Sequence, residues 1–220
     1  MSNLKDTLTG FAGFVATEIA AAGVLKGDGR PDQKPDMTSK PKGTLYKDNQ
    51  LTDGAVLWLK TSNGNSWKVI SGDTGWLTLK KTASLLETSH IKIRRIGDTV
   101  YYSFGGGQWG WFGIVRRGGP GYAPQTSYGN KGCRVVHPGG IPEGFQSVGS
   151  QVGNIYKDAT AVYGTIYLGG IADSNFIALG FTNDIPTNQD TTDIRVSALN
   201  YPTDQAWPKL AELKTKGFIS

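Results

Sequence analysis

Glycine is the residue that most restricts how this chain can fold. It accounts for 31 of the 220 residues, and much of it recurs every few positions between residues 97 and 180, among Tyr, Trp, Val and Ile. Prolines add further breaks at positions 120, 124, 138, 142, 186, 202 and 208. Such spacing suits many short strands joined by tight turns. We therefore predict a mainly β fold, with an antiparallel sandwich or small barrel over residues 76–220.

The clearest strand signal in this region is IKIRRIGDTVYYSF, which follows His90. Apolar residues at positions 91, 93, 100 and 102 alternate with polar neighbours, and Gly97-Asp98 lies at the reversal. This pattern predicts a hairpin with one buried face. Later runs predict strands at 111–115, 134–137, 162–168, 176–181 and 194–199, and a short helical turn at 206–214.

A smaller β unit is predicted over residues 43–75. Two turn sequences, DNQLTDG and SNGNS, separate three strand-like runs at 43–47, 55–61 and 67–71. So small a meander needs large side chains to bury enough apolar area. We therefore expect Trp58, Trp67 and Trp76 to form its centre, with a carbohydrate-binding role for these rings as the alternative.

The first 25 residues follow a different pattern, in which apolar residues recur at alternating four- and three-residue steps. The series is Leu4, Leu8, Phe11, Val15, Ala22 and Leu25, with Glu18 at the one missing position. About three heptads of this kind predict a coiled-coil-like helix. It either associates with copies of itself and docks into a larger assembly, which we favour, or packs on its own chain.

Residues 26–42, KGDGRPDQKPDMTSKPK, join this helix to the β units. They carry three prolines and many charges, and Met37 is their one apolar residue. A segment of this composition buries little on its own, so we predict a linker with extended character.

Composition and charge exclude several classes of protein. The net charge is +5, but the basic residues are scattered among acidic ones, so we expect no nucleic-acid partner. No stretch approaches 18 uncharged apolar residues, so no membrane insertion is expected. The N-terminus lacks a signal-peptide pattern, which predicts synthesis in a cytoplasm. Cys133 is the only cysteine, which excludes an intrachain disulfide and a cysteine-rich metal site.

Nucleophiles and histidines are too few and too poorly placed for catalysis. His90 and His137 do not suffice for a typical histidine metal site. Cys133 and His137 would lie roughly 13 Å apart along a strand, which is beyond hydrogen-bond reach. Cys133 is therefore expected to be a small buried residue. We predict no catalytic residue, no metal and no cofactor.

A cluster of acidic residues is the remaining alternative for chemistry. The segment NDIPTNQDTTD contains Asp184, Asp190 and Asp193. Turn formation is the favoured role in so Pro-, Asn- and Thr-rich a loop. A cation site and a carboxylate pair for glycoside cleavage are the other two interpretations.

Aromatic and basic residues gather in QWGWFGIVRR. On a strand, Trp109 and Trp111 share a face, and Arg116 and Arg117 follow them. Rings stack on sugar faces and guanidinium groups meet phosphates or carboxylates, so this stretch predicts a glycan-binding site. The alternative is that the rings fill a core or a threefold axis. Further candidates lie in loops and offer hydrogen bonds to hydroxyls: Tyr122, Tyr128, Asp173 and Asn175.

Longer phrases carry a family resemblance over about residues 43–208. They are GTLYKDNQLTDGAVLWLKTSNGNSWKVISGDTGW and IKIRRIGDTVYYSF, followed by QWGWFGIVRRGGPGY, GGIPEGF, YGTIYLGG and DIRVSALNYPTDQAWP. Together they resemble a module of minor tail proteins, tail fibres and head fibres of bacteriophages that infect Gram-positive bacteria. Relatives of this type are usually homotrimers in which a stem carries a β head, and many recognise cell-surface saccharides.

The resemblance implies a non-enzymatic virion fibre protein, made in the host cytoplasm. Residues 1–25 would hold three copies together and attach them to other virion proteins, while the head binds a host cell-surface glycan, expected to be a wall glycan. One alternative is a structural capsid or collar decoration fibre without a specific receptor. Another is a wall-glycan hydrolase. Tail tip, collar and capsid surface are all open as its position.

Overall fold

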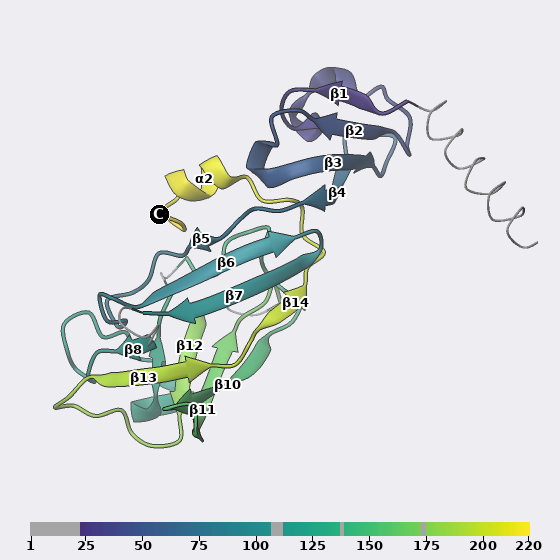
Figure 1. The fold of residues 1–220 in the computed structure, drawn as a ribbon. Coiled ribbons are helices and arrows are strands. Elements are labelled where there is room, and N and C mark those ends of the chain that lie inside the picture. Colours follow the sequence, from purple (N-terminus) through teal and green to yellow (C-terminus); the bar gives the residue numbers. More distant parts are fainter. Residues whose placement is uncertain (1–22, 107–111, 137–138, 173–174) are drawn as a thin grey trace, which may run out of the picture. The chain divides into compact units, whose positions relative to one another are not determined.

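The computed structural model describes residues 23–106, 112–136, 139–172 and 175–220. Within them the chain is mainly β, as predicted, and its strands pair antiparallel except for β1 with β2. It divides into two compact units, an N-terminal unit that ends at Gly72 and a C-terminal unit from Asp73 to Ser220 (Figure 1). Most of the predicted N-terminal helix, residues 1–22, lies outside the described residues. None of the described helices is long and apolar enough to cross a membrane.

The N-terminal unit contains a four-stranded sheet in the order β1-β2-β3-β4. Its strands are β1 Leu25–Gly27, β2 Leu45–Asp48, β3 Ala55–Lys60 and β4 Trp67–Gly72. The antiparallel pairing of β2, β3 and β4 confirms the predicted meander. The parallel strand β1 is an addition that the sequence pattern did not predict.

The prediction of a linker over residues 26–42 is wrong. The segment begins within β1, forms 3-10 turns at Pro31–Gln33 and Pro35–Met37, and buries both Arg30 and Met37. The guanidinium of Arg30 pairs with Asp53 at 2.7 Å and Asp32 at 2.9 Å, and lies 5.1 Å from the centre of the Trp58 ring. The charges are thus interior contacts, which is why a polar composition still forms a packed segment.

The tryptophans divide between the two units. Trp58 and Trp67 are buried in the N-terminal unit, as predicted. Trp76 is not part of that centre, because it belongs to the C-terminal unit and is 46% exposed, with the Arg94 guanidinium 5.8 Å from its ring centre. The boundary between the units accordingly falls after Gly72, a few residues before the predicted one.

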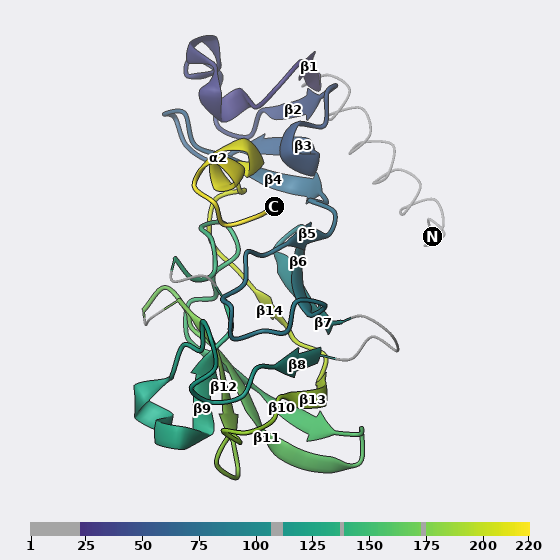
Figure 2. The same ribbon diagram turned by 90° about the vertical axis from the view of Figure 1, so that its left-hand side faces the viewer.

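The C-terminal unit contains two antiparallel sheets (Figures 1 and 2). The six-stranded sheet has the order β8-β13-β10-β11-β12-β9, with β8 Phe112–Ile114, β9 Gly132–Arg134, β10 Gln151–Lys157, β11 Ala161–Leu168, β12 Ile177–Phe181 and β13 Thr191–Val196. The four-stranded sheet has the order β14-β7-β6-β5, with β5 Leu77–Thr78, β6 His90–Ile96, β7 Thr99–Gly105 and β14 Asn200–Pro202. A short helix, α2 Leu210–Thr215, follows and overlaps the predicted 206–214 region.

Both sheets contribute to one apolar core. The hairpin β6–β7 buries Ile91, Ile93 and Val100 completely, which confirms the predicted buried face. In β12, the side chains of Ile177, Leu179 and Phe181 belong to the same core. Ala178 and Gly180 alternate with them, and so occupy the other face of the six-stranded sheet. That other face carries the candidate site.

Candidate ligand-binding cleft

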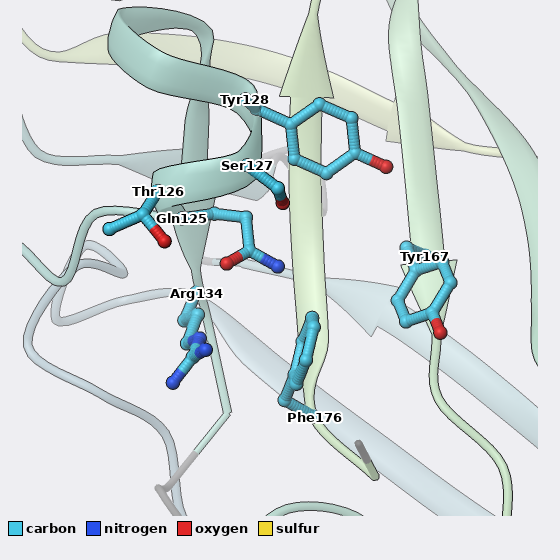
Figure 3. A pocket seen from close by; sticks show the side chains of 7 residues that line it. All are labelled: Gln125, Thr126, Ser127, Tyr128, Arg134, Tyr167 and Phe176. Atoms are coloured by element: carbon cyan, nitrogen blue, oxygen red, sulfur yellow. The ribbon is translucent and has the colours of Figure 1, made fainter. Parts of the chain in front are cut away.

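A cleft of about 410 Å³ lies on the outer face of the six-stranded sheet. Tyr167 on β11 alternates with the core residues Ile166 and Leu168, and Arg134 on β9 follows the buried Cys133, so both side chains face away from the core. A 3-10 helix at Thr126–Lys131 borders the same face (Figure 3). The lining residues are Gln125, Thr126, Ser127, Tyr128, Arg134, Tyr167 and Phe176.

Small residues on β12 and β9 make room for the cleft. Tyr167, Ala178 and Arg134 form one row across the strands, and Thr165, Gly180 and Gly132 form the next. A Cβ at Gly180 would lie 3.1 Å from the Tyr128 ring, and one at Gly132 would lie 2.5 Å from the Cβ of Tyr128. Glycine in the second row therefore lets the 3-10 helix bring Tyr128 down onto the sheet.

Two tilted aromatic rings and a guanidinium line the opposite part of the cleft. The ring centres of Tyr167 and Phe176 are 5.4 Å apart at an interplanar angle of 35°. The Arg134 guanidinium carbon lies 4.6 Å from the centre of the Phe176 ring, within the range of a cation–π contact. Arg134 is exposed, and among the described residues no carboxylate lies within ion-pair distance of it. Among the described residues, the Phe176 ring is the contact that positions its guanidinium.

Gln125 supplies a polar group beside this cation. The residue is 4% exposed, and its amide is not among the fully buried side-chain groups that lack a hydrogen bond in the described part of the chain. Figure 3 shows this amide directed into the space that Ser127, Arg134 and Phe176 border. Water in the cleft or a ligand can therefore form hydrogen bonds with it. The cleft therefore offers an amide, a hydroxyl and a guanidinium beside aromatic rings.

The structure does not bring the sequence-predicted glycan site together in this cleft. Trp109, Trp111 and Asp173 lie outside the described residues. Arg116 is exposed and donates its backbone N–H to Asp190 Oδ1 at 2.8 Å, while Arg117 donates its backbone N–H to the Pro186 carbonyl at 2.7 Å. Neither arginine lines the cleft.

Two predicted loop residues make internal hydrogen bonds beside the cleft. The hydroxyl of Tyr122 donates to the Gly132 carbonyl at 2.9 Å, and burial raises its pKa to about 12. The amide of Asn175 donates to the carbonyls of Gly139 and Ile141, at 3.2 and 3.3 Å. Three of the predicted loop candidates have described positions, Tyr122, Tyr128 and Asn175, and of these only Tyr128 lines the cleft.

The three aspartates of the 184–193 loop have separate partners. Asp184 accepts a hydrogen bond from Asn130, Asp190 accepts the backbone N–H of Arg116, and Asp193 lies 3.1 Å from the Arg195 guanidinium. No group of three acidic, histidine or cysteine side chains suited to a metal occurs in the described part of the chain. Cys133 is fully buried, as predicted, and burial raises its pKa to about 12.

Sequence reasoning missed Gln125, Arg134, Tyr167 and Phe176 as a group. They are spread over more than fifty positions and meet because β9 and β11 flank β12. A local signal was present in IALGF at β12, where large core residues alternate with the small Ala178 and Gly180. The chain matches no protein-family model, no curated protein and no solved structure.

Proposed function

We propose that the chain is a non-enzymatic fibre protein of a bacteriophage virion, which attaches to a host cell-surface glycan through the cleft of the C-terminal unit. The virion part of this proposal rests on the sequence resemblance. It includes a sandwich or small-barrel head, a coiled-coil segment at residues 1–25 that holds three copies together and attaches them to other virion proteins, and synthesis in the host cytoplasm.

The combination of groups in the cleft supports glycan binding. Sugars present both apolar ring faces and many hydroxyls, and binding sites meet them with aromatic surfaces and a few placed polar groups. Tyr128, Tyr167 and Phe176 supply the rings, and Gln125 supplies a side-chain amide that borders the same cleft.

The lining favours binding over cleavage. Glycoside hydrolysis ordinarily uses two carboxyl groups on either side of the scissile bond. None of the seven lining residues is an aspartate or a glutamate. A glycan held here would meet donors and rings, and no acid–base pair from these residues.

A glycan array probed with the full-length chain tests the ligand class. We expect retention on a subset of saccharides, and a Phe176→Ala variant should bind them about tenfold more weakly because a stacked ring is lost. Val162→Ala, which trims an exposed side chain outside the lining set, is the control and should bind like the wild type. Absence of any retention would contradict glycan binding, and release of reducing sugar from wall material would instead indicate a hydrolase.

Light scattering tests the assembly part of the proposal separately. The full chain should have three times the mass of one 23.6 kDa chain, and a chain without residues 1–22 should have the mass of a single truncated chain. A stable monomer of the full chain would contradict the trimeric fibre, whatever the array shows.

A further inference from the structure

On the basis of the proposed function, we further propose that the cleft selects an anionic saccharide, and that Arg134 is the residue that selects it. The ligand class is a sugar that carries a carboxylate or a phosphate next to an apolar ring face. The anionic group would meet Arg134, and the adjoining sugar would lie on Phe176 and Tyr167.

The charge balance of the cleft is the first observation. Arg134 is the one charged residue among the seven that line it. Its guanidinium is held 4.6 Å above Phe176, and the described residues place no carboxylate against it. The planar fork of a guanidinium matches carboxylate and phosphate oxygens, and these charge-assisted bonds are about twice as strong as neutral ones. Among the described residues Arg134 has no anionic partner, so an anionic ligand can take that place.

Three of the other arginines already have protein partners for their guanidinium groups. Arg30 pairs with Asp32 and Asp53, and Arg94 pairs with Asp73. Arg95 donates to the carbonyls of Gly97, Gly144, Gln205 and Ala206. Arg134 contrasts with them, because the contact that fixes it is an aromatic ring beside an open cleft.

Neutral groups next to Arg134 can complete the recognition of an anion. The Gln125 amide and the Ser127 hydroxyl border the same space (Figure 3). Both are hydrogen-bond donors. An oxyanion held by Arg134 leaves further lone pairs, which these donors are placed to satisfy.

The strand register gives the ligand a direction. Arg134, Ala178, Tyr167 and Val152 occupy successive strands of one row. Strands lie about 4.8 Å apart, so Tyr167 is roughly 10 Å and Val152 roughly 14 Å along the row from Arg134. Val152 is 63% exposed, which extends the apolar surface past Tyr167. A chain of two or more sugars, lying across the strands with its anion at Arg134, fits this layout.

Matched polysaccharide pairs test the inference with the full-length chain. Polygalacturonate and its methyl ester differ in the carboxylate charge, and phosphomannan and dephosphorylated mannan differ in the phosphate. We expect the wild type to bind at least one acidic member about tenfold more tightly than its neutral partner. The neutral polymer cannot form the charge-assisted hydrogen bond with Arg134. The pair that shows the preference identifies carboxylate or phosphate as the source of the charge.

Three variants separate the role of Arg134 from net charge. Arg134→Gln should abolish the preference, and Arg134→Lys should restore part of it because the charge returns without the planar fork. Lys131→Gln removes the same charge from an exposed position outside the lining set and should keep the preference. A preference that persists in Arg134→Gln, or disappears equally in Lys131→Gln, would overturn the inference.

The outcomes also separate this inference from the proposed function. Equal binding of acidic and neutral members, weakened in both cases by Phe176→Ala, would overturn charge selection and leave glycan binding intact. If the chain binds only neutral glycans on the array, charge selection is likewise overturned and glycan binding stands. Failure to bind all four polymers together with an empty glycan array would remove both proposals.

Discussion

The two units of the chain differ in how much of their interior is apolar. The N-terminal unit buries Arg30, Asp48 and Lys60 at its centre, and Arg30 and Lys60 lie over the rings of Trp58 and Trp67. The C-terminal unit has a large aliphatic and aromatic core. It buries Arg95, which lies over Trp207, and it places Arg134 over Phe176 at its surface, in the cleft. A small unit buries too little apolar area to be stable on that basis alone. Stacking cations on its few rings adds interior contacts to the N-terminal unit.

The same contact thus has two roles that depend on its surroundings. Arg30 over Trp58 is enclosed and paired with two carboxylates, so it supports the fold. Arg134 over Phe176 is open to solvent and has no carboxylate partner among the described residues, so it is available to a ligand. The predictions below test this difference by disturbing one unit at a time.

The largest effect is expected from Arg30→Met. The substitution leaves Asp32 and Asp53 without their cation in a mostly buried position, which should cost the N-terminal unit about 4 kcal/mol. Hydrogen exchange of amides in residues 43–72 should accelerate, while exchange in the C-terminal unit stays unchanged. Arg94→Met breaks a more exposed pair with Asp73 and is the control, with a cost below about 1 kcal/mol. Equal acceleration in both units would contradict their independence.

Leu179→Ala should have the reciprocal effect on the C-terminal unit. Leu179 is fully buried on β12, and its truncation leaves a cavity that should cost about 3 kcal/mol. Exchange should accelerate in β10, β11 and β12 and remain unchanged in the N-terminal unit. The exposed truncation Val162→Ala on the same sheet should cost less than about 0.5 kcal/mol.

Acid should affect the N-terminal unit through Asp48. Burial opposes ionisation of this carboxyl, but hydrogen bonds from Thr52, Gln50 and Gly29 outweigh it and lower its pKa below the ordinary 3.8. A lowered pKa gives stability that is present above the ordinary value and is lost as pH falls through the folded-state value. We expect the N-terminal unit to lose stability as the pH falls below 3.8, measured by exchange in residues 43–72.

Asp48→Asn is the matched test of that pH dependence. The variant should be less stable at neutral pH, and its N-terminal unit should lose the part of the acid response that Asp48 contributes. An unchanged response to acid in Asp48→Asn would assign the effect to other carboxyls.

The smallest effect on stability, with a clear effect on binding, is expected from Gly180→Ala. Its Cβ would lie 3.1 Å from the Tyr128 ring, which is 39% exposed and can move outward. Stability should change by less than about 1 kcal/mol, while binding of the retained glycan weakens because the ring leaves its place. Gly149→Ala, where nothing lies within 4 Å of the added Cβ, should leave binding unchanged in the same titration.

The sequence predicted those features that depend on local alternation. The meander of β2 to β4 and the β6–β7 hairpin follow from runs of large apolar residues between turn sequences. Residues 26–42 were misjudged because proline and charge density is typical of a linker, and it does not reveal that Trp58 and Asp53 enclose Arg30. Trp76 was assigned to a core that Trp58 and Trp67 form without it.

The cleft could not be predicted, because it depends on strand order. Arg134 and Tyr167 are 33 positions apart in the chain and face each other across β12 only because β9 and β11 both pair with that strand. The sequence analysis instead placed the glycan site at the cluster of aromatic and basic residues around Trp109. The alternation in IALGF indicated an outward face of small residues, and the register was needed to show what lies beside them.

Photoaffinity labelling tests the central claim most directly. The full-length chain would be irradiated with a photoreactive derivative of the glycan that it retains most strongly on the array, and the labelled peptides would be identified by mass spectrometry. The account predicts labels on peptides that contain Tyr128, Arg134, Tyr167 or Phe176. Labels confined to residues 107–122, with none on those four positions, would contradict it.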